Sequence, residues 1–512
     1  MAKTIKISAP SLGGVTITGV ETAPTTVQFR GLTYATIEKR YDYPTRVDAY
    51  TEDVDATKYG PSPPQPFRVM AAFLPRDQVP TEAPPPQDEL ACLNLNITRP
   101  TVLPADGSKI PVVVWIFPGA NTFGSASDKS YEPSALVARS ASKNLPILFV
   151  NINYRLSLLG FVYVDGRANH AVYDQLEAMR WVKAHIGDFG GDAENITLMG
   201  ESAGSLGTHY HALNPLSKGL FRRIGMMSTV VESRTPFPIE DAKGLAAKAK
   251  RLTGTTTDEE FKAASVEDLM EAVGVIGGMY GPVDDGGYLG ESILANGPYI
   301  DKLPIEEVEA VMLGNTFFES IVYEPRVALI PAATRLQRLL EVPIVGPVFA
   351  SKYGITAEDS EENLKRLMQM YEDLSYGQPV DMTVKSLRAG GFKTYHYLFD
   401  QPNPYDPGYG AHHGVDVLYF FNSFKFDASY DVFVDKYQTG WIRFFYGLAP
   451  WDFMAEDGHE VANVVFVDKD AHERAEGELE KRRRADVFAF LNQFRYEYDA
   501  YNITKRFLYV TD

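Results

Sequence analysis

A serine flanked by two glycines, in the stretch G-E-S-A-G at residues 200–204, is the part of this sequence best suited to chemistry. The apolar run at residues 196–199 predicts a strand, and residues 203–213 predict a helix directly after it. Glycines on both sides allow a sharp turn between strand and helix, so the hydroxyl of Ser202 stands exposed at the end of a sheet. The pattern predicts a nucleophilic serine.

A serine hydroxyl is a poor nucleophile at neutral pH, so it needs a histidine base that is oriented by an acid. In this type of sheet the chain order is serine, acid, histidine, which restricts the base to the histidines after Ser202. His413 ends a loop rich in proline and glycine, whereas His209 and His211 lie on the helix that leaves the serine and should point away. We expect His413 to be the base and Glu319, just past a predicted strand, to be the acid.

The elements that must position these residues alternate between strands and helices, which predicts a large, mostly parallel sheet with helices on both faces. The expected strands are residues 93–97, 111–117, 146–154, 196–199, 308–315 and 392–399, and a helix is expected over 174–185. Residues 1–35 alternate apolar and polar side chains and predict antiparallel hairpins. Sites in such sheets lie beyond the carboxyl ends of the strands, where Ser202 and Glu319 are placed.

Three further segments have distinct patterns. Residues 43–86 are rich in proline and predict an irregular loop. Two charged stretches with helical periodicity, around 240–275 and 356–382, predict helical insertions beside the sheet. A charge-rich pattern over 471–494, with a basic run at 481–484, predicts a solvated helix.

Charge and cysteine content exclude several classes of protein. The 67 acidic and 49 basic residues give a formal charge of −18, which opposes binding to nucleic acid or to an anionic membrane. Cys92 is the only cysteine, so no intramolecular disulfide is possible, which favours a reducing compartment.

The N-terminus has no apolar signal core and no apolar run is long enough to span a bilayer. We expect a cytoplasmic protein without metal or cofactor.

A series of short motifs, taken in order, resembles the type-B carboxylesterases, the cholinesterase and para-nitrobenzyl esterase family of the α/β-hydrolase fold. The motifs include Gly31-Leu32-Thr33-Tyr34, Asn153-Tyr154-Arg155-Leu156, Phe189-Gly190-Gly191-Asp192, residues 200–205, Pro282-Val283-Asp284-Asp285-Gly286 and His413-Gly414. The resemblance implies that residues 1–512 form a single α/β-hydrolase domain. It also implies Ser202 as nucleophile, Glu319 as acid and His413 as base.

The resemblance further implies an oxyanion hole made of the backbone N–H groups of Gly119, Ala120 and Ala203. The family's loop of one histidine and three glycines reads Phe117-Pro118-Gly119-Ala120 here. Pro118 does not occupy a donor position, so its missing N–H is harmless. If the loop requires a positive φ at Ala120, the Cβ of this residue strains the hole.

The same resemblance places Glu201, Ser228 and Asp416 beside His413 as a buried polar group that tunes the orientation of the imidazole. Apolar side chains near the loops are candidates for lining the substrate pocket. They are Phe123, Met227, Phe317, Phe318, Phe420 and Phe421. Such a lining would favour a hydrophobic ester or lactone.

The implied activity is that of a serine carboxylester hydrolase that forms a covalent acyl-enzyme on a small-molecule ester or lactone. One alternative keeps the acyl-enzyme but passes the acyl group to an alcohol, which makes a transesterase or a cyclase. A second alternative is a catalytically silent, esterase-like binding protein. Self-association into a homodimer through the C-terminal helices is left open.

Overall fold

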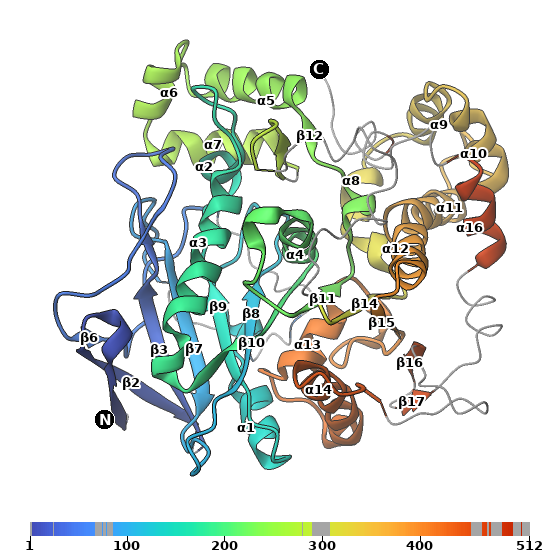
Figure 1. The fold of residues 1–512 in the computed structure, drawn as a ribbon. Helices are drawn as coiled ribbons and strands as arrows, with labels where there is room; N and C mark the ends of the chain where they lie inside the picture. Colours follow the sequence, from blue (N-terminus) through green and yellow to red (C-terminus); the bar gives the residue numbers. More distant parts are fainter. Residues whose placement is uncertain are drawn as a thin grey trace.

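A computed structural model describes residues 3–23, 25–66, 74, 78, 85–278, 280–288, 308–451, 463–467, 470–472, 484–494 and 503 of this chain. One thirteen-stranded sheet runs through the described part, with helices packed on both of its sides (Figure 1). This arrangement confirms the predicted α/β-hydrolase architecture, a large and mostly parallel sheet between helices.

The strand order of the sheet shows where the parallel part lies. The order is β1 (Thr4–Ala9), β2 (Val15–Ala23), β3 (Thr26–Thr33), β7 (Asn94–Pro100), β9 (Leu148–Ile152), β8 (Ile110–Ile116), β10 (Gly191–Glu201), β11 (Arg223–Met227), β14 (Ala310–Thr316), β15 (Lys393–Phe399), β16 (Asn463–Val467) and β17 (Asp470–His472), and β6 (Val54–Asp55) pairs with β2. Pairings are antiparallel from β1 to β9 and again between β16 and β17, and parallel between them. The hairpins predicted for residues 1–35 are therefore confirmed.

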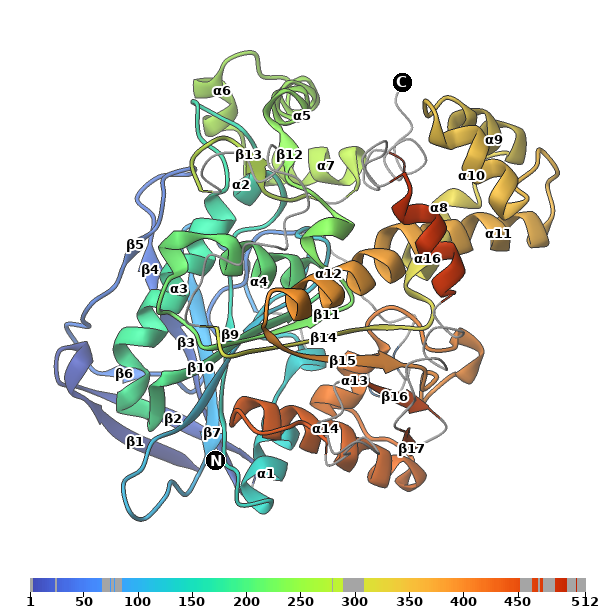
Figure 2. The same ribbon diagram turned by 45° about the vertical axis from the view of Figure 1, so that its right-hand side comes forward.

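Three strands of the middle of the sheet are buried over their whole length, which explains their continuous apolar sequences. Every residue of β8, β9 and β14 is buried. Helices α3 (His170–His185), α4 (Ala203–Leu213) and α12 (Gln378–Ala389) lie on one side of the sheet, and α1 (Ser134–Ser142), α13 (Val415–Phe421) and α14 (Asp431–Phe445) lie on the other (Figure 2). The parallel strands are thus shielded from water on both faces.

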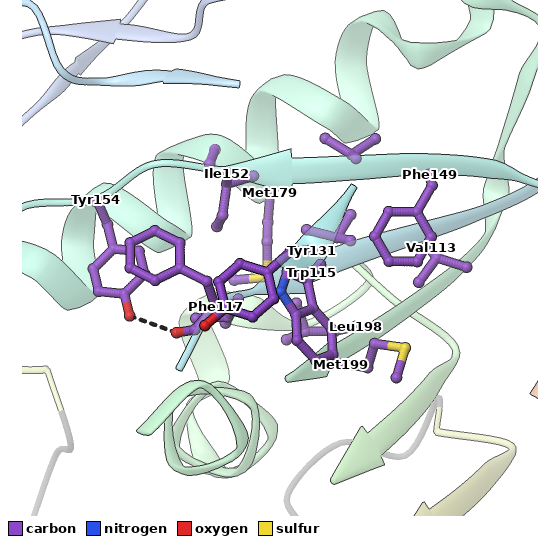
Figure 3. Close-up of a cluster of buried hydrophobic side chains, with 14 of the residues drawn as sticks. Val113, Trp115, Phe117, Tyr131, Phe149, Ile152, Tyr154, Met179, Leu198 and Met199 are labelled. Carbon is purple, nitrogen blue, oxygen red and sulfur yellow. Dashed lines mark hydrogen bonds between the residues drawn. The ribbon is translucent and has the colours of Figure 1, made fainter. Parts of the chain in front are cut away.

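An aromatic cluster fills the space between β8, β9 and α13. The ring of Trp115 lies 5.0 Å from that of Phe421 and 6.0 Å from that of Phe420, and Phe149 lies 5.5 Å from Phe421. Figure 3 shows Trp115 and Phe149 among the buried side chains of this region. Phe420 and Phe421 are fully buried here, so the prediction that they line a substrate pocket is wrong.

Helices occur at both predicted insertions. The first holds α5 (Ile239–Leu252), α6 (Asp258–Ala263) and α7 (Val266–Ile276), and the second holds α11 (Glu361–Glu372), a π-helical turn (Asp373–Gly377) and α12. Between the two insertions lie α8 (Glu324–Val327), α9 (Ala332–Leu340) and α10 (Val345–Tyr353). Short elements elsewhere in the chain are the helix α2 (Ser157–Phe161) and the strands β4 (Ala35–Thr36), β5 (Thr45–Arg46), β12 (Phe237–Pro238) and β13 (Val283–Asp284). That all 512 residues form a single domain stays a prediction.

The predicted helix over 471–494 is wrong in its first part. Residues 470–472 form β17, which pairs with β16 and extends the sheet, and helix α16 covers only Ala485–Asn492. Arg484 precedes this helix and forms an ion pair with Asp373 at 2.8 Å, so it is not part of a solvated helix face. Residues 481–483 and most of the proline-rich stretch 67–84 lie outside the described residues.

A buried ion pair joins the loop after β9 to helix α3. The guanidinium of Arg155 donates from Nη2 to Asp174 Oδ1 at 2.7 Å and from Nε to Oδ2 at 2.8 Å, and its Nη1 donates to the carbonyl of Asp42 at 2.9 Å. Both side chains are at most 2% exposed. A charge pair of this kind is tolerated in the interior because each charged atom has a hydrogen-bond partner.

Arg155→Met should lower the free energy of unfolding by about 3–5 kcal/mol, because it leaves the Asp174 carboxylate buried without its cation. Urea unfolding followed by circular dichroism measures this loss. The double variant Arg155→Met, Asp174→Leu removes both charges and should recover most of it. A loss below about 1 kcal/mol for the single variant would contradict this interpretation, since that is the range of exposed pairs.

Within the described residues, no helix combines the length and the apolar character needed to cross a membrane.

Candidate active site

Ser202 occupies the sharp turn between β10 and α4, with φ 53° and ψ −120°. Both neighbouring glycines are required by close backbone contacts. A Cβ on Gly204 would lie 2.0 Å from the carbonyl oxygen of Ile116, and one on Gly200 would lie 2.4 Å from the carbonyl carbon of Gly204. The turn predicted from the sequence is therefore present, and it holds Ser202 at the carboxyl end of the central strand.

Hydrogen bonds to the neighbouring strand hold this turn in place. The backbone N–H of Ser202 donates to the carbonyl of Met227 at 3.0 Å. The hydroxyl of Thr229 donates to the carbonyl of Ser202 at 2.5 Å, and the hydroxyl of Ser205 donates to the carbonyl of Thr229 at 2.5 Å. Because its backbone conformation is strained, the turn depends on such contacts.

The predicted acid and base are in contact. Glu319 follows β14 at the start of a 3₁₀ turn (Glu319–Val322), and its Oε2 lies 2.5 Å from Nδ1 of His413. Its Oε1 accepts the backbone N–H of Thr316 at 2.6 Å. The two segments are joined through their backbones, since Phe318 N–H donates to the carbonyl of Ala411 at 2.9 Å. Glu319 is fully buried, and His413 is 8% exposed.

The other histidines near the site have structural partners. His412 donates from Nδ1 to the carbonyl of His413 and accepts at Nε2 from Asn403. His209 accepts the backbone N–H of Val231, and the Nε2 of His211 contacts Gln175. Of the histidines discussed here, His413 is the one paired with Glu319.

Glu201 lies on the far side of the imidazole from Glu319. Its Oε1 is 3.2 Å from Nε2 of His413, the ring nitrogen that does not contact Glu319. Among the described residues, the Ser202 hydroxyl makes no hydrogen bond to His413. In enzymes without substrate, the hydrogen bond between a nucleophile and its base is often long, and it shortens when substrate binds.

The residues predicted to surround His413 are all buried. Asp416 is fully buried, and its Oδ2 accepts the hydroxyl of Tyr397 at 2.9 Å. Ser228 is also fully buried, and its N–H donates to the carbonyl of Gly314 at 2.8 Å. Burial raises the pKa of Glu201 to about 8, against the opposing effect of His413, and burial raises that of Asp416 to about 7. Two buried carboxyl groups with raised pKa values, those of Glu201 and Asp416, are therefore part of the surroundings of His413.

The loop after β8 has a strained conformation at the position where the sequence left the sign of φ open. Gly119 has φ 114°, and a Cβ there would lie 2.0 Å from the carbonyl oxygen of Phe123. Ala120 and Asn121 follow with φ 57° and 55°. The left-handed conformation costs Ala120 about 1–2 kcal/mol, which the surrounding contacts must offset.

Those contacts come from the segment that follows α7 and from the start of α2. Tyr280 N–H donates to the carbonyl of Ala120 at 3.1 Å, and the side chain of Asn121 donates to the carbonyl of Tyr280 at 2.9 Å. Ser157 N–H donates to the carbonyl of Asn121 at 2.7 Å. Under the loop, the ring of Phe117 stacks on that of Tyr154, whose hydroxyl donates to the Phe117 carbonyl (Figure 3). The strained loop is thus fixed from both sides.

Three backbone N–H groups near Ser202 are free to bind an anion. Those of Gly119, Ala120 and Ala203 donate to no group in the described part of the chain. Strands β8 and β10 are paired in a register that sets Gly200 opposite Ile116, which brings the end of β8 next to the serine turn. The pairing therefore places the loop after β8 beside the serine turn, and both carry backbone N–H groups without a partner among the described residues.

The remaining candidates for a pocket lining do not form a common surface. Met227 is fully buried, Phe317 is 61% exposed, and Phe318 packs against the separate apolar cluster of α9, α10 and α11. Phe123 is half-buried beside Gly119.

Sequence reasoning missed the residues that support the site from distant segments. Asn121 and Tyr280 fix the loop after β8, while Glu372 and Tyr376 contact the turn of Glu319 and the ring of His413. A weak signal existed for Asn121, because asparagine tolerates the left-handed conformation. For the others no local pattern exists, since their contacts depend on packing between distant segments.

Comparisons with known proteins agree with this geometry. The model of the carboxylesterase family matches residues 2–319 and 331–445. Lipase 3 of Yarrowia lipolytica is 33% identical over 437 residues, covering 83% of this chain and 85% of the lipase. An inactive carboxylesterase-like protein of Byssochlamys spectabilis is 30% identical over 246 residues, covering 45% of this chain and 41% of that protein.

Solved structures share the fold. A carboxylesterase of Geobacillus stearothermophilus superposes with a TM-score of 0.75 at 24% identity, covering 94% of this chain and 99% of the other. The family match spans most of the sequence, and the motifs that it includes are those that build the serine turn and the strands around it. This chain belongs to the carboxylesterase family of α/β-hydrolases and is a carboxylic ester hydrolase.

Proposed function

We propose that this protein hydrolyses carboxylic esters through a covalent acyl-enzyme on Ser202, with His413 as base and Glu319 as the acid that orients it. The observation that carries the proposal is the Glu319 to His413 contact of 2.5 Å beside a strained serine turn. The contact fixes which nitrogen of the imidazole carries the proton.

In the acylation step, Nε2 of His413 takes the proton of the Ser202 hydroxyl while the serine oxygen bonds to the ester carbonyl carbon. The carbonyl oxygen becomes an anion within reach of the N–H groups of Gly119, Ala120 and Ala203. Collapse of this intermediate breaks the bond to the alcohol, which leaves with the proton from His413. Water, activated by the same imidazole, then attacks the acyl group and releases the acid.

A hydrophobic ester or lactone is the proposed substrate class. The similarity to Lipase 3 of Yarrowia lipolytica supports an apolar acyl or alcohol group, because that relative is named as a lipase. Phe123, half-buried beside Gly119, supplies apolar surface next to the proposed oxyanion loop. Transfer of the acyl group to an alcohol or an internal hydroxyl instead of water remains the alternative within this mechanism.

Turnover of para-nitrophenyl esters of short and medium chain length tests the proposal. A burst of about one para-nitrophenol per chain is expected where deacylation is slow, as for any acyl-enzyme mechanism. Adding an alcohol and analysing the products separates hydrolysis from acyl transfer. Absence of both burst and turnover in the folded protein would instead support a catalytically silent, esterase-like binding protein. The relative from Byssochlamys spectabilis, which is named as inactive, is an example of such a protein.

The pH dependence of the reaction should report on Glu201. Burial alone would lower the pKa of His413, but Glu201 and Glu319 raise it to about 9. Only the neutral imidazole accepts the serine proton, so kcat/KM should rise with pH through this pKa. Glu201→Gln removes one of the two carboxylates, so the acid limb should move to lower pH by about one unit.

A pH-rate profile of both proteins measures this shift. Glu309→Gln is a suitable control, because Glu309 pairs with Arg222 and Arg223 at the other end of the parallel strands. An acid limb that is identical in wild type and Glu201→Gln would exclude a role of Glu201 in setting the pKa of His413.

A cytoplasmic location and self-association complete the proposal. The location is supported by Cys92, which is buried and unpaired, so the fold is built without a disulfide. A homodimer through the C-terminal helices stays a prediction. Analytical ultracentrifugation would decide it.

A further inference from the structure

The turn that carries the proposed catalytic acid rests on a second buried glutamate. Glu372 is the last residue of α11 and is 7% exposed. Its Oε2 accepts the backbone N–H of Ser320, the residue after Glu319, at 2.8 Å. The first N–H groups of a short 3₁₀ turn have no acceptor within the turn, so Glu372 supplies a buried one from another helix.

The π-helical turn that follows Glu372 contacts the other half of the pair. The ring of Tyr376 lies 5.6 Å from the imidazole of His413, and its hydroxyl donates to that of Tyr323 at 3.1 Å. Tyr323 ends the 3₁₀ turn that begins at Glu319. The segment from Glu372 to Tyr376 therefore contacts both ends of the acid-bearing turn and the base, and π-helical turns of this kind are frequent at functional sites.

The far side of the π-helical turn is held by the C-terminal helix. Asp373 accepts from the hydroxyl of Tyr353 at 2.8 Å and pairs with Arg484 at 2.8 Å. Gly377 is packed so closely on Phe488 of α16 that a Cβ would lie 2.6 Å from the ring. The turn is thus fixed from both sides and can act as a rigid support.

The charge state of Glu372 fits a supporting role. Burial raises its pKa well above the usual range, and the nearby charge of Glu319 raises it further. A neutral carboxyl accepts the Ser320 N–H without repelling the Glu319 carboxylate, whose charge must serve His413. A glutamine would offer the same acceptor with no charge.

We propose that Glu372 is a positioning residue, which holds the turn of Glu319 so that its carboxylate meets Nδ1 of His413. This inference rests on the proposed acyl-enzyme function. It makes the geometry of the triad depend on Glu372, which lies outside the triad. Its hydrogen bond goes to the backbone N–H of Ser320, so its proposed effect on catalysis is indirect.

Two variants at this position separate positioning from general stability. Glu372→Gln keeps the acceptor and should retain kcat within about threefold, whereas Glu372→Ala should lower kcat at least about tenfold with KM nearly unchanged. Rates are divided by the concentration of active sites titrated with a fluorophosphonate, so unfolded protein does not lower the calculated kcat. Glu232→Ala is the matched control, because Glu232 is another carboxyl with a pKa raised by burial, to about 7, bonded to Thr383 instead of to the acid turn.

A second readout does not require turnover. The proton shared by Glu319 and His413 should give a far-downfield proton resonance, which is identified by its loss in His413→Ala. We expect this resonance in wild type, Glu372→Gln and Glu232→Ala, and its loss or upfield shift in Glu372→Ala. An unchanged resonance together with unchanged kcat in Glu372→Ala would overturn the inference, as would equal impairment of the Gln and Ala variants. A wild type that shows the resonance but no turnover would contradict the proposed function and leave the positioning role to be decided by the resonance alone.

Discussion

Ser202→Ala is expected to lower kcat for a para-nitrophenyl ester by at least about 10⁴-fold, the scale seen when a catalytic serine is removed. The alanine keeps the Cβ and can adopt the same strained backbone as the serine, so the turn between β10 and α4 should persist. The loss corresponds to at least about 5 kcal/mol of transition-state stabilisation. It is measured by initial rates on protein whose unfolding midpoint matches that of wild type.

Ser217→Ala serves as the control for this substitution. Ser217 is another buried serine, but it lies beyond the end of α4 and close to the ring of His211. Its replacement should leave kcat within about threefold. Turnover in Ser202→Ala above a hundredth of the wild-type rate would mean that another group is the nucleophile.

Glu319→Gln is expected to lower kcat by about 10³–10⁴-fold, because it should invert the tautomer of His413. The Oε1 of Glu319 accepts the Thr316 N–H at 2.6 Å, so a glutamine must place its amide oxygen there. Its NH₂ group then faces Nδ1 of His413, which has to accept a hydrogen bond. The proton of the neutral ring moves to Nε2, and the imidazole can no longer take the serine proton.

Glu319→Asp tests this argument, because it keeps the charge but shortens the side chain. It should lose less activity than Glu319→Gln, and high pH should not rescue the Gln variant, since a neutral ring with the wrong tautomer is inactive at every pH. A Gln variant that regains its activity at high pH would show that the charge of Glu319 matters only through the pKa of His413.

The parts of the site that depend on local sequence were predictable. The serine turn follows from the apolar strand and the two glycines, because a Cβ on either glycine would collide with the carbonyl of Ile116 and one on Gly200 would also collide with Gly204. The family's loop pattern left open whether Ala120 needs a positive φ, and the structure answers this with a φ of 57°. In the same way, the buried strands were visible as continuous apolar runs.

Features that depend on long-range packing were not predictable. Phe420 and Phe421 follow His413 closely in sequence, but α13 turns their rings into the core against Trp115. Residues 470–472 form a strand because β16 offers a free edge, although their charged sequence suits a helix. Glu372 meets Ser320 across 52 positions, and nothing in the pattern of α11 distinguishes this glutamate from the exposed ones at its start.

The most direct test of the proposed mechanism is the mass of the protein after reaction with a fluorophosphonate. A single adduct per chain, located by peptide mapping on the segment that contains Ser202 and strongly slowed in Glu319→Gln, is the predicted result. No adduct on the folded protein, or an adduct on a different residue, would contradict Ser202 as the activated nucleophile.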